Sequence, residues 1–166
     1  MKCLTLLCLA QLRLVDTDLH LHIENGQDNK ADPETVQDGE SAIAHQNQAH
    51  ALRTRRSQFV FLSTLVKDVF IIRAADSHLC LHAHGGSKSG ARICLHEDEA
   101  YARKNNNPNS RFRVVRIGTG FALKVEDKNL CIHAHGGSNE GAKFVLHEGV
   151  EYARTHENSQ FVFVPI

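Results

Sequence analysis

The chain has 166 residues, the length of one ordinary domain with a buried core. Its 19 basic and 19 acidic residues balance, which argues against nucleic acid or an anionic membrane as the main partner. The five cysteines show neither close spacing nor a CxxC pair, so neither a disulfide scaffold nor a zinc knuckle is expected.

The N-terminal residues 1–10 contain one lysine and a short apolar run, which is the outline of a signal peptide. The same run merges into the first strand predicted below, so a secreted and a cytoplasmic location both stay open. No later run approaches the ~18 apolar residues of a membrane-spanning helix, and we expect no membrane insertion.

A first copy of an internal repeat covers approximately residues 10–63, where the segment LHLHIENG begins at Leu19. This copy carries an insertion at residues 27–40 that is acidic, contains proline and glycine, and has the composition of an exposed loop. The basic run that follows is interpreted as a solvated loop: Arg53, Arg55 and Arg56.

The second and third copies, at residues 69–117 and 120–166, are closely similar to each other. The second contains LCLHAHGGSKSGARICLHEDEAYAR, and the third contains LCIHAHGGSNEGAKFVLHEGVEYAR 51 residues later. Cys80 and Cys131 occupy the same place in the two copies, and we predict that both are small buried residues. The whole chain, residues 1–166, is predicted to be one domain of three repeats.

Each copy predicts four short strands in the same order. A β-rich run such as Phe70–Arg73 is followed by a polar turn and an alternating strand such as Leu79–His82. Paired glycines predict a turn with positive φ angles before a third strand at Ile93–His96. A polar loop follows, and a strand at Phe112–Ile117 closes the unit. Three units are too few for a propeller or a capped solenoid. We therefore predict the all-β, pseudo-three-fold barrel called the β-trefoil, which closes the sheet edges.

The histidines and glycines that recur in register have three interpretations. In the first they are structural, since glycines make turns and histidines can bind the backbone. In the second, pairs such as His82 and His84 share a strand face and bind a metal with His96, but zinc usually requires three or four ligands. In the third, backbone amides, neutral imidazoles and Asp98 hydrogen-bond to sugar hydroxyls in a shallow pocket. We expect no metal and no cofactor.

The pattern His-x-x-Gly-Gly-Ser, followed by Leu-His and later by Phe-x-Phe, resembles the mytilectins, the galactose-binding β-trefoil lectins of mussels. The Cys-Leu strand with Gly-Gly-Ser and the closure at 158–161 resemble the ricin-B-type lectin repeat more distantly. The resemblance implies sugar contacts in the second and third copies from His82, Gly85, Gly86, His96, Asp98, His133, Gly136, Gly137 and His147. The first copy retains only weaker counterparts, His22, Gly26 and His45. Gly149 stands where the second copy has Asp98.

These observations predict a multivalent lectin for terminal galactose or N-acetylgalactosamine on glycans and glycoconjugates. The alternative is a β-trefoil protein-interaction module, cytokine-like or actin-binding, without sugar binding. Catalysis is not predicted, because a polar set that recurs in each repeat is what multivalent binding produces, and Glu97, Asp98 and Glu99 are interpreted as solvated charges. The oligomeric state stays open, a dimer included.

Overall fold

The computed structural model describes residues 8–24, 36–45, 51, 53–104 and 107–166. Twelve strands are present in these residues, and they follow one another with short connections. The strands are β1 (Cys8–Leu14), β2 (His20–Ile23), β3 (Ala42–His45), β4 (Phe59–Ser63), β5 (Val69–Ala74), β6 (Cys80–Ala83), β7 (Ile93–His96), β8 (Phe112–Ile117), β9 (Gly120–Val125), β10 (Cys131–Ala134), β11 (Phe144–His147) and β12 (Phe161–Pro165).

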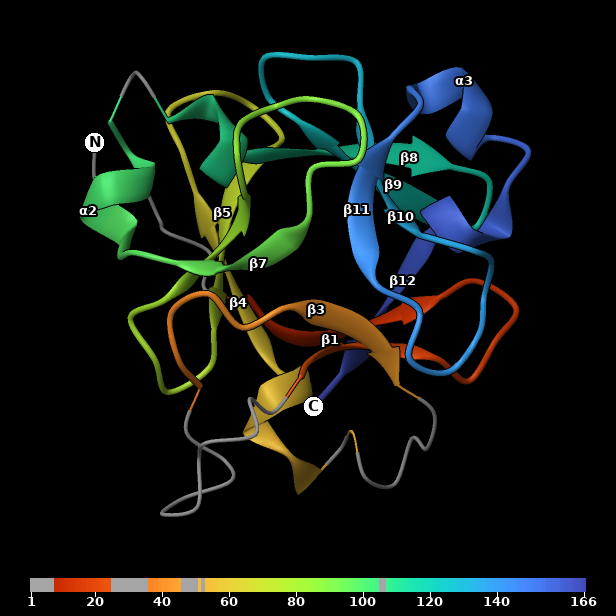
Figure 1. Ribbon diagram of the computed structural model, residues 1–166, viewed down its shortest axis with the longest axis horizontal. Helices are drawn as coiled ribbons and strands as arrows, with labels where there is room; N and C mark the ends of the chain where they lie inside the picture. Colours follow the sequence, from red (N-terminus) through yellow and green to blue (C-terminus); the bar gives the residue numbers. More distant parts are fainter. Residues whose placement is uncertain (1–7, 25–35, 46–50, 52, 105–106) are drawn as a thin grey trace.

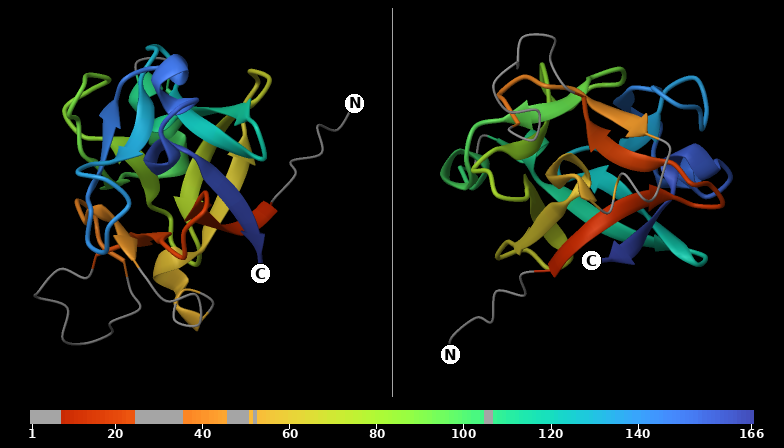
Figure 2. Two further views of the ribbon diagram at one scale, coloured as in Figure 1. Left: turned by 90° about the vertical axis from the view of Figure 1, so that its right-hand side faces the viewer. Right: turned by 90° about the horizontal axis from the view of Figure 1, so that it is seen from below.

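Six of these strands close a barrel. β1 pairs with β4 and β12, β5 pairs with β4 and β8, and β9 pairs with β8 and β12, all antiparallel. Closure gives every barrel strand a neighbour on both sides, which removes exposed sheet edges. Figure 2 shows β12 beside β1, with the C-terminus at the end of the molecule away from β7 and β11.

The other six strands form three hairpins, β2–β3, β6–β7 and β10–β11, each paired over four residues. Figure 1 looks onto these hairpins, with β3, β7 and β11 around the centre of the view. Each repeat therefore contributes two barrel strands and one hairpin: the first repeat is β1–β4, the second β5–β8 and the third β9–β12. This arrangement confirms the predicted β-trefoil.

The core is assembled from equivalent positions of the three repeats. Phe59, Phe112 and Phe161 begin the last strand of each repeat, and all three are fully buried. Alternation along the strands adds further apolar layers, for example Leu12, Ile72 and Leu123. Burial of side chains of this size contributes roughly 1.5–3 kcal/mol each, so the repeated apolar positions carry most of the stability.

Cys80 and Cys131 are buried as predicted, each in a small apolar cluster outside the main core. Burial raises the pKa of the Cys80 thiol to about 12 and that of Cys131 to about 11, so neither is a reactive thiolate near neutral pH. The first repeat has His20 at this place. His20 is fully buried, and neither of its ring nitrogens has a hydrogen-bond partner.

Two features differ from the predictions. The stretch after the third strand of a repeat, expected to be a polar loop, contains a one-turn helix: α2 (Glu99–Ala102) in the second repeat and α3 (Val150–Ala153) in the third. The prediction that Arg56 is solvated is wrong, because its side chain is only 3% exposed and pairs with the carboxylate of Glu40 at 2.9 Å. Arg53 and Arg55 are exposed, as expected.

Residues 27–35 of the predicted acidic insertion lie outside the described residues. The part that follows, residues 36–40, turns at Asp38–Gly39 and packs against the second repeat, since Gly39 N–H donates to the carbonyl of Leu95 at 2.8 Å. Over the described part of the chain, none of the helices has the length and apolar character needed to cross a membrane.

Candidate functional site

The first predicted histidine of each repeat lies on the first strand of that repeat's hairpin (β2, β6 or β10) and bonds to a serine. Three short 3₁₀ turns, η1 (Arg55–Ser57), η2 (Pro108–Ser110) and η3 (Glu157–Ser159), supply these serines just before the closing strand. The Nδ1–Oγ distances are 2.9, 2.7 and 2.9 Å for the pairs His22–Ser57, His82–Ser110 and His133–Ser159. The same polar contact is thus built three times.

An asparagine fixes the other ring nitrogen in the second and third repeats. The Nδ2 amide of Asn109 donates to Nε2 of His82 at 3.2 Å, and that of Asn158 donates to Nε2 of His133 at 3.3 Å. An Nε2 that accepts leaves the proton on Nδ1, which then donates to the serine. Both rings are therefore held as neutral imidazoles of one tautomer.

The electrostatics of these two rings agree with the neutral form. The His82 and His133 side chains are each about 5% exposed. Burial, with a smaller contribution from the neighbouring histidines, lowers the pKa of both to about 4. Because Ser and Asn already satisfy both ring nitrogens, His82 and His133 hold the site together more readily than they contact a ligand.

The second predicted histidine of each repeat packs against the first. Ring centroids lie 4.8, 4.7 and 4.6 Å apart in the pairs His22–His45, His82–His96 and His133–His147. The second ring is the more accessible one, as the 28% exposure of the His96 side chain shows. It follows that His96 and His147 carry the solvent-facing nitrogens of the second and third sites.

A tyrosine completes each of these two clusters. Tyr101 meets His96 edge to face at 5.4 Å, and Tyr152 meets His147 in the same way at 5.0 Å. Both rings are half-buried, and Tyr101 offers an apolar surface beside polar atoms, whereas one face of Tyr152 is covered by the His156 ring stacked on it at 3.6 Å. The tyrosines were not among the predicted site residues, although the letters YAR recur in both copies and could have indicated them.

Asp98 acts at the start of α2 rather than inside the cluster. Its carboxylate accepts from the N–H of Tyr101 at 2.8 Å and so caps the turn that carries the tyrosine. In the third repeat Asn129 does the equivalent work, since its Oδ1 accepts from Val150 N–H at 3.2 Å. A Cβ on Gly149 would lie 2.2 Å from the Asn129 amide, which explains why glycine replaces aspartate there.

We expect Asp98→Ala to lower the free energy of unfolding by about 1 kcal/mol, as the loss of an N-cap typically does. Asp98→Asn, whose amide oxygen can still accept, should stay within ~0.5 kcal/mol of the wild type. Urea denaturation of the two variants measures this. Equal stability of the alanine and asparagine variants would show that the N-cap at Asp98 contributes nothing to the free energy of unfolding.

The paired glycines of the second and third repeats form the turns that follow β6 and β10. Gly85 and Gly86 have φ angles of +81° and +95°, and Gly136 and Gly137 have +82° and +102°. These values lie in the region that glycine adopts without strain, as predicted. His84, the residue before Gly85, lies past the end of β6 and is exposed, so it does not join His82 and His96.

The first repeat departs from the other two. Arg56 stands in the place of Asn109 and Asn158, and its guanidinium bonds to the carbonyl of Ile23 at 3.4 Å and to Glu40. The predicted Gly26 lies outside the described residues, as does residue 50, the counterpart of the two tyrosines. Among the described residues, no group of three or more His, Cys, Asp or Glu side chains is arranged to hold a metal ion.

Comparisons with known proteins agree with the fold. No protein-family model matches the chain, and no curated protein sequence matches it. Among solved structures, the designed three-fold symmetric protein ThreeFoil superposes with a TM-score of 0.74 at 15% identity, over 95% of this chain and 99% of that one. The ricin B-like lectin of Macrolepiota procera, solved with lactose, gives 0.68 at 15% identity over 95% of both chains.

An exo-β-1,3-galactanase from Clostridium thermocellum also superposes, with a TM-score of 0.73 at 11% identity, over 100% of this chain and 31% of that one. At identities this low, the superpositions demonstrate a shared β-trefoil fold but no shared function. The function therefore has to be argued from the site itself.

Proposed function

We propose that the protein is a non-catalytic, multivalent lectin whose sites are the histidine–tyrosine clusters of the second and third repeats. The sugar would be a terminal galactose or N-acetylgalactosamine of a glycan or glycoconjugate, as the resemblance to the mytilectins implies. The fold is shared with the lactose-bound lectin of Macrolepiota procera, which supports a glycan as the partner.

One observation carries this proposal: the same cluster is built twice outside the core, with matching geometry. In both repeats a buried, neutral histidine is fixed by serine and asparagine, a second histidine packs on it within 4.7 Å, and a tyrosine borders the second ring. A fold needs no imidazole or tyrosine at these positions, so the repetition of the whole set favours a repeated ligand contact.

The chemistry of the cluster suits a sugar. A hexose has apolar C–H faces and a rim of hydroxyl groups that both donate and accept. The tyrosine ring offers an apolar face, while imidazole nitrogens and the backbone at the glycine turn offer donors and acceptors. In this assignment His96 and His147 contact the sugar, with Gly85, Gly86, Gly136 and Gly137 beside them, and His82, His133 and Asp98 position the contacting groups.

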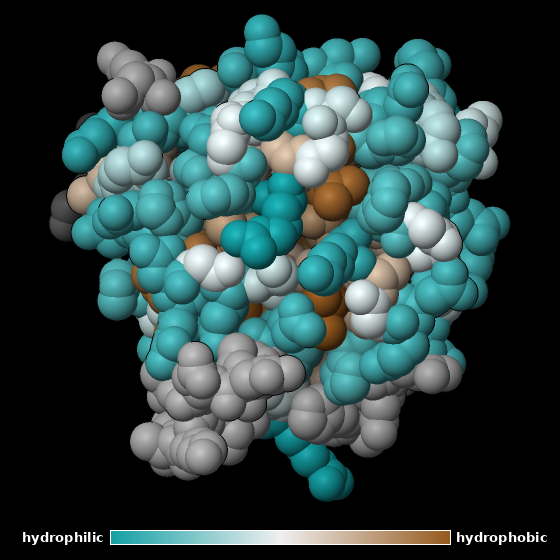
Figure 3. All heavy atoms as spheres, viewed as in Figure 1, coloured by the Kyte–Doolittle hydropathy of each residue, from teal (hydrophilic) through white to brown (hydrophobic). Residues whose placement is uncertain are grey.

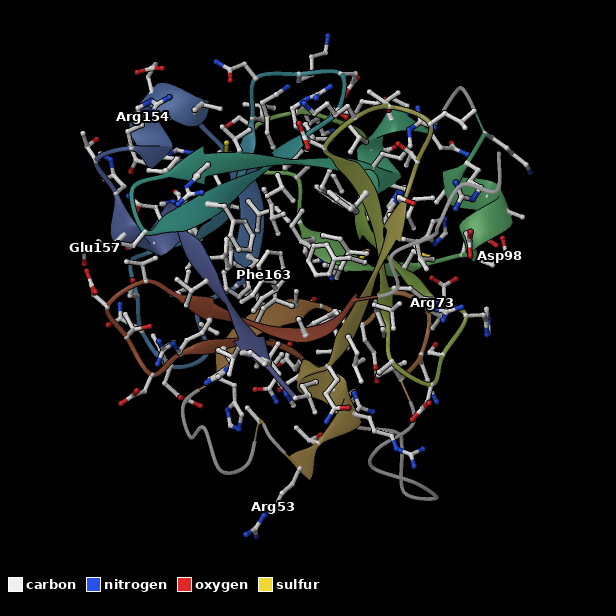
Figure 4. The ribbon with its side chains drawn as sticks, turned by 180° about the vertical axis from the view of Figure 1, so that it is seen from behind. Arg53, Arg73, Asp98, Arg154, Glu157 and Phe163 are labelled. Atoms are coloured by element: carbon white, nitrogen blue, oxygen red, sulfur yellow. The ribbon has the colours of Figure 1, made fainter. Side chains whose placement is uncertain are left out.

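The two clusters face different directions. In Figure 1, α2 and α3 lie on opposite sides of the view, and Figure 4 likewise shows Asp98 and Arg154, which flank these helices, at opposite edges. Two separate sites can bind two glycans at once, which raises avidity without new contacts. Figure 3, viewed as Figure 1, shows mostly hydrophilic residues on the face that carries the hairpins, with apolar residues near the centre of this face.

The test is isothermal titration with galactose, N-acetylgalactosamine and lactose, using His96→Ala, His147→Ala and the double variant. Each single variant should lose one of two binding sites, and the double variant should lose both. Circular dichroism should report an unchanged fold, because both side chains are partly exposed.

Absence of heat with all three sugars would contradict the proposal and favour the protein-interaction alternative. If the double variant still binds sugar as the wild type does, the binding sites lie elsewhere in the protein. Arg116→Ala, which removes an exposed side chain from the barrel strand β8, is the control for a non-specific effect.

A further inference from the structure

The three repeats interlock through loops that reach from each repeat to the next. In each loop a glycine N–H donates to a carbonyl of the neighbouring repeat at 2.7–2.8 Å: Gly39 to Leu95, Gly90 to Leu146 and Gly141 to Ala44. Return bonds from the backbone N–H groups of Leu95, Leu146 and Ala44 complete each contact at 2.8–2.9 Å. These paired bonds fix the position of every loop relative to the next hairpin.

In two of the three loops, the residue before the glycine meets the second histidine of the next repeat. Asp38 of the first repeat lies 2.9 Å from Nδ1 of His96, and Glu140 of the third repeat lies 2.6 Å from Nδ1 of His45. Ser89 precedes Gly90 and is the sequence counterpart of these two carboxylates, in the loop that bonds to the hairpin of the third repeat. Within the described part of the chain, Ser89 and His147 make no hydrogen bond with each other.

A carboxylate at this position determines what the histidine offers. An ionised carboxylate has only acceptors, so Nδ1 of His96 must donate to Asp38, and the neutral ring then carries its lone pair on Nε2. Because the other ring of the pair, His82, has both nitrogens engaged, Nε2 of His96 is the imidazole acceptor left for a ligand hydroxyl. His147 lacks such a carboxylate, and its ring is free to hold the proton on either nitrogen.

We propose, on the basis of the proposed function, that Asp38 of the first repeat is a positioning residue for the site of the second repeat. It holds His96 in the tautomer that accepts a sugar hydroxyl, and it makes this site bind more tightly than the third-repeat site. The sites of this pseudo-symmetric protein are therefore unequal, and the inequality is set by the residues at positions 38 and 89.

Two reciprocal exchanges test the proposal, Asp38→Ser and Ser89→Asp. Long-range ¹H–¹⁵N NMR distinguishes protonated from unprotonated ring nitrogens, and lactose titrations followed at the His96 and His147 rings give one affinity per site. Asp38→Ser should turn His96 into a mixture of tautomers and weaken lactose there by roughly three- to tenfold, the effect of one well-placed hydrogen bond. It should leave His147 unchanged.

Ser89→Asp should place the His147 proton on Nδ1 and tighten the third-repeat site by a similar factor. Asp38→Asn, whose amide oxygen still accepts, should retain most of the wild-type affinity at His96. A His96 tautomer or affinity unaffected by Asp38→Ser would overturn the proposal.

If the wild type binds none of the sugars, the proposed function fails. The ring assignments then still decide the role of Asp38. A proton on Nδ1 of His96 in the wild type that is lost in Asp38→Ser supports positioning by Asp38, and an unchanged ring refutes it.

Discussion

Lowering the pH from 7 to 4.5 is expected to destabilise the protein by roughly 2 kcal/mol through each of His82 and His133. Their pKa in the folded protein is about 4, against 6.5 for an exposed histidine. Between these two values the unfolded chain binds the protons and the folded one does not. Stability is therefore complete above pH 6.5 and is lost as the pH falls toward 4.

The structure gives the cause of this loss. Each ring is buried, donates from Nδ1 to a serine and accepts at Nε2 from an asparagine. A proton on Nε2 would turn this nitrogen into a donor that faces the donor Nδ2 of the asparagine. The added charge would also lie next to a second imidazole, whose centroid is less than 5 Å away. Burial also lowers the pKa of His20, whose protonation adds to the loss in the same direction.

Urea denaturation at several pH values between 7 and 4.5 measures the effect. The double variant His82→Gln/His133→Gln is the control: it should be less stable at pH 7 but lose distinctly less stability on acidification. The two proteins have the same carboxylates, so the difference between the two slopes reports on the two histidines. Parallel slopes would show that these rings do not titrate out of the folded state in this range.

The strands of the second and third repeats could be predicted closely from the sequence because their signal is local. Alternation places Leu81 and Ile132 inside, and the 51-residue offset between two nearly identical copies marks the turns. β7 and β8 begin and end at the predicted residues. Burial of Cys80 and Cys131 followed from the same register.

The site was only partly predictable. His82 and His96 do come together, because they lie on the two strands of one hairpin. The partners Ser110 and Asn109 sit 28 and 27 residues from His82, beyond the reach of any local pattern, although the Asn-Ser pair recurs in the third repeat. Asp38 comes from a different repeat, and although its position recurs at Ser89 and Glu140, the sequence does not show that this loop reaches the hairpin of the next repeat.

Breaking the buried ion pair of the first repeat is expected to cost about 3–5 kcal/mol. The Arg56 and Glu40 side chains are 3% and 7% exposed and meet at 2.9 Å. Arg56→Ala takes the guanidinium away from a buried carboxylate that also accepts from the backbone N–H of Gln37, and Glu40→Ala takes the carboxylate away from a buried guanidinium that also donates to the carbonyl of Ile23. Both variants should therefore unfold at much lower urea concentrations than the wild type.

The other two repeats provide the matched control for this pair. There an asparagine replaces the arginine and donates to the carbonyl that corresponds to Ile23, namely Ala83 or Ala134, at 3.1–3.2 Å. The double variant Arg56→Asn/Glu40→Gln removes both charges, restores that donor and gives His22 the asparagine found beside His82. It should recover most of the stability that either alanine variant loses. A loss below ~1 kcal/mol in the alanine variants, or a double variant as unstable as they are, would mean that the ion pair does not hold the first repeat together.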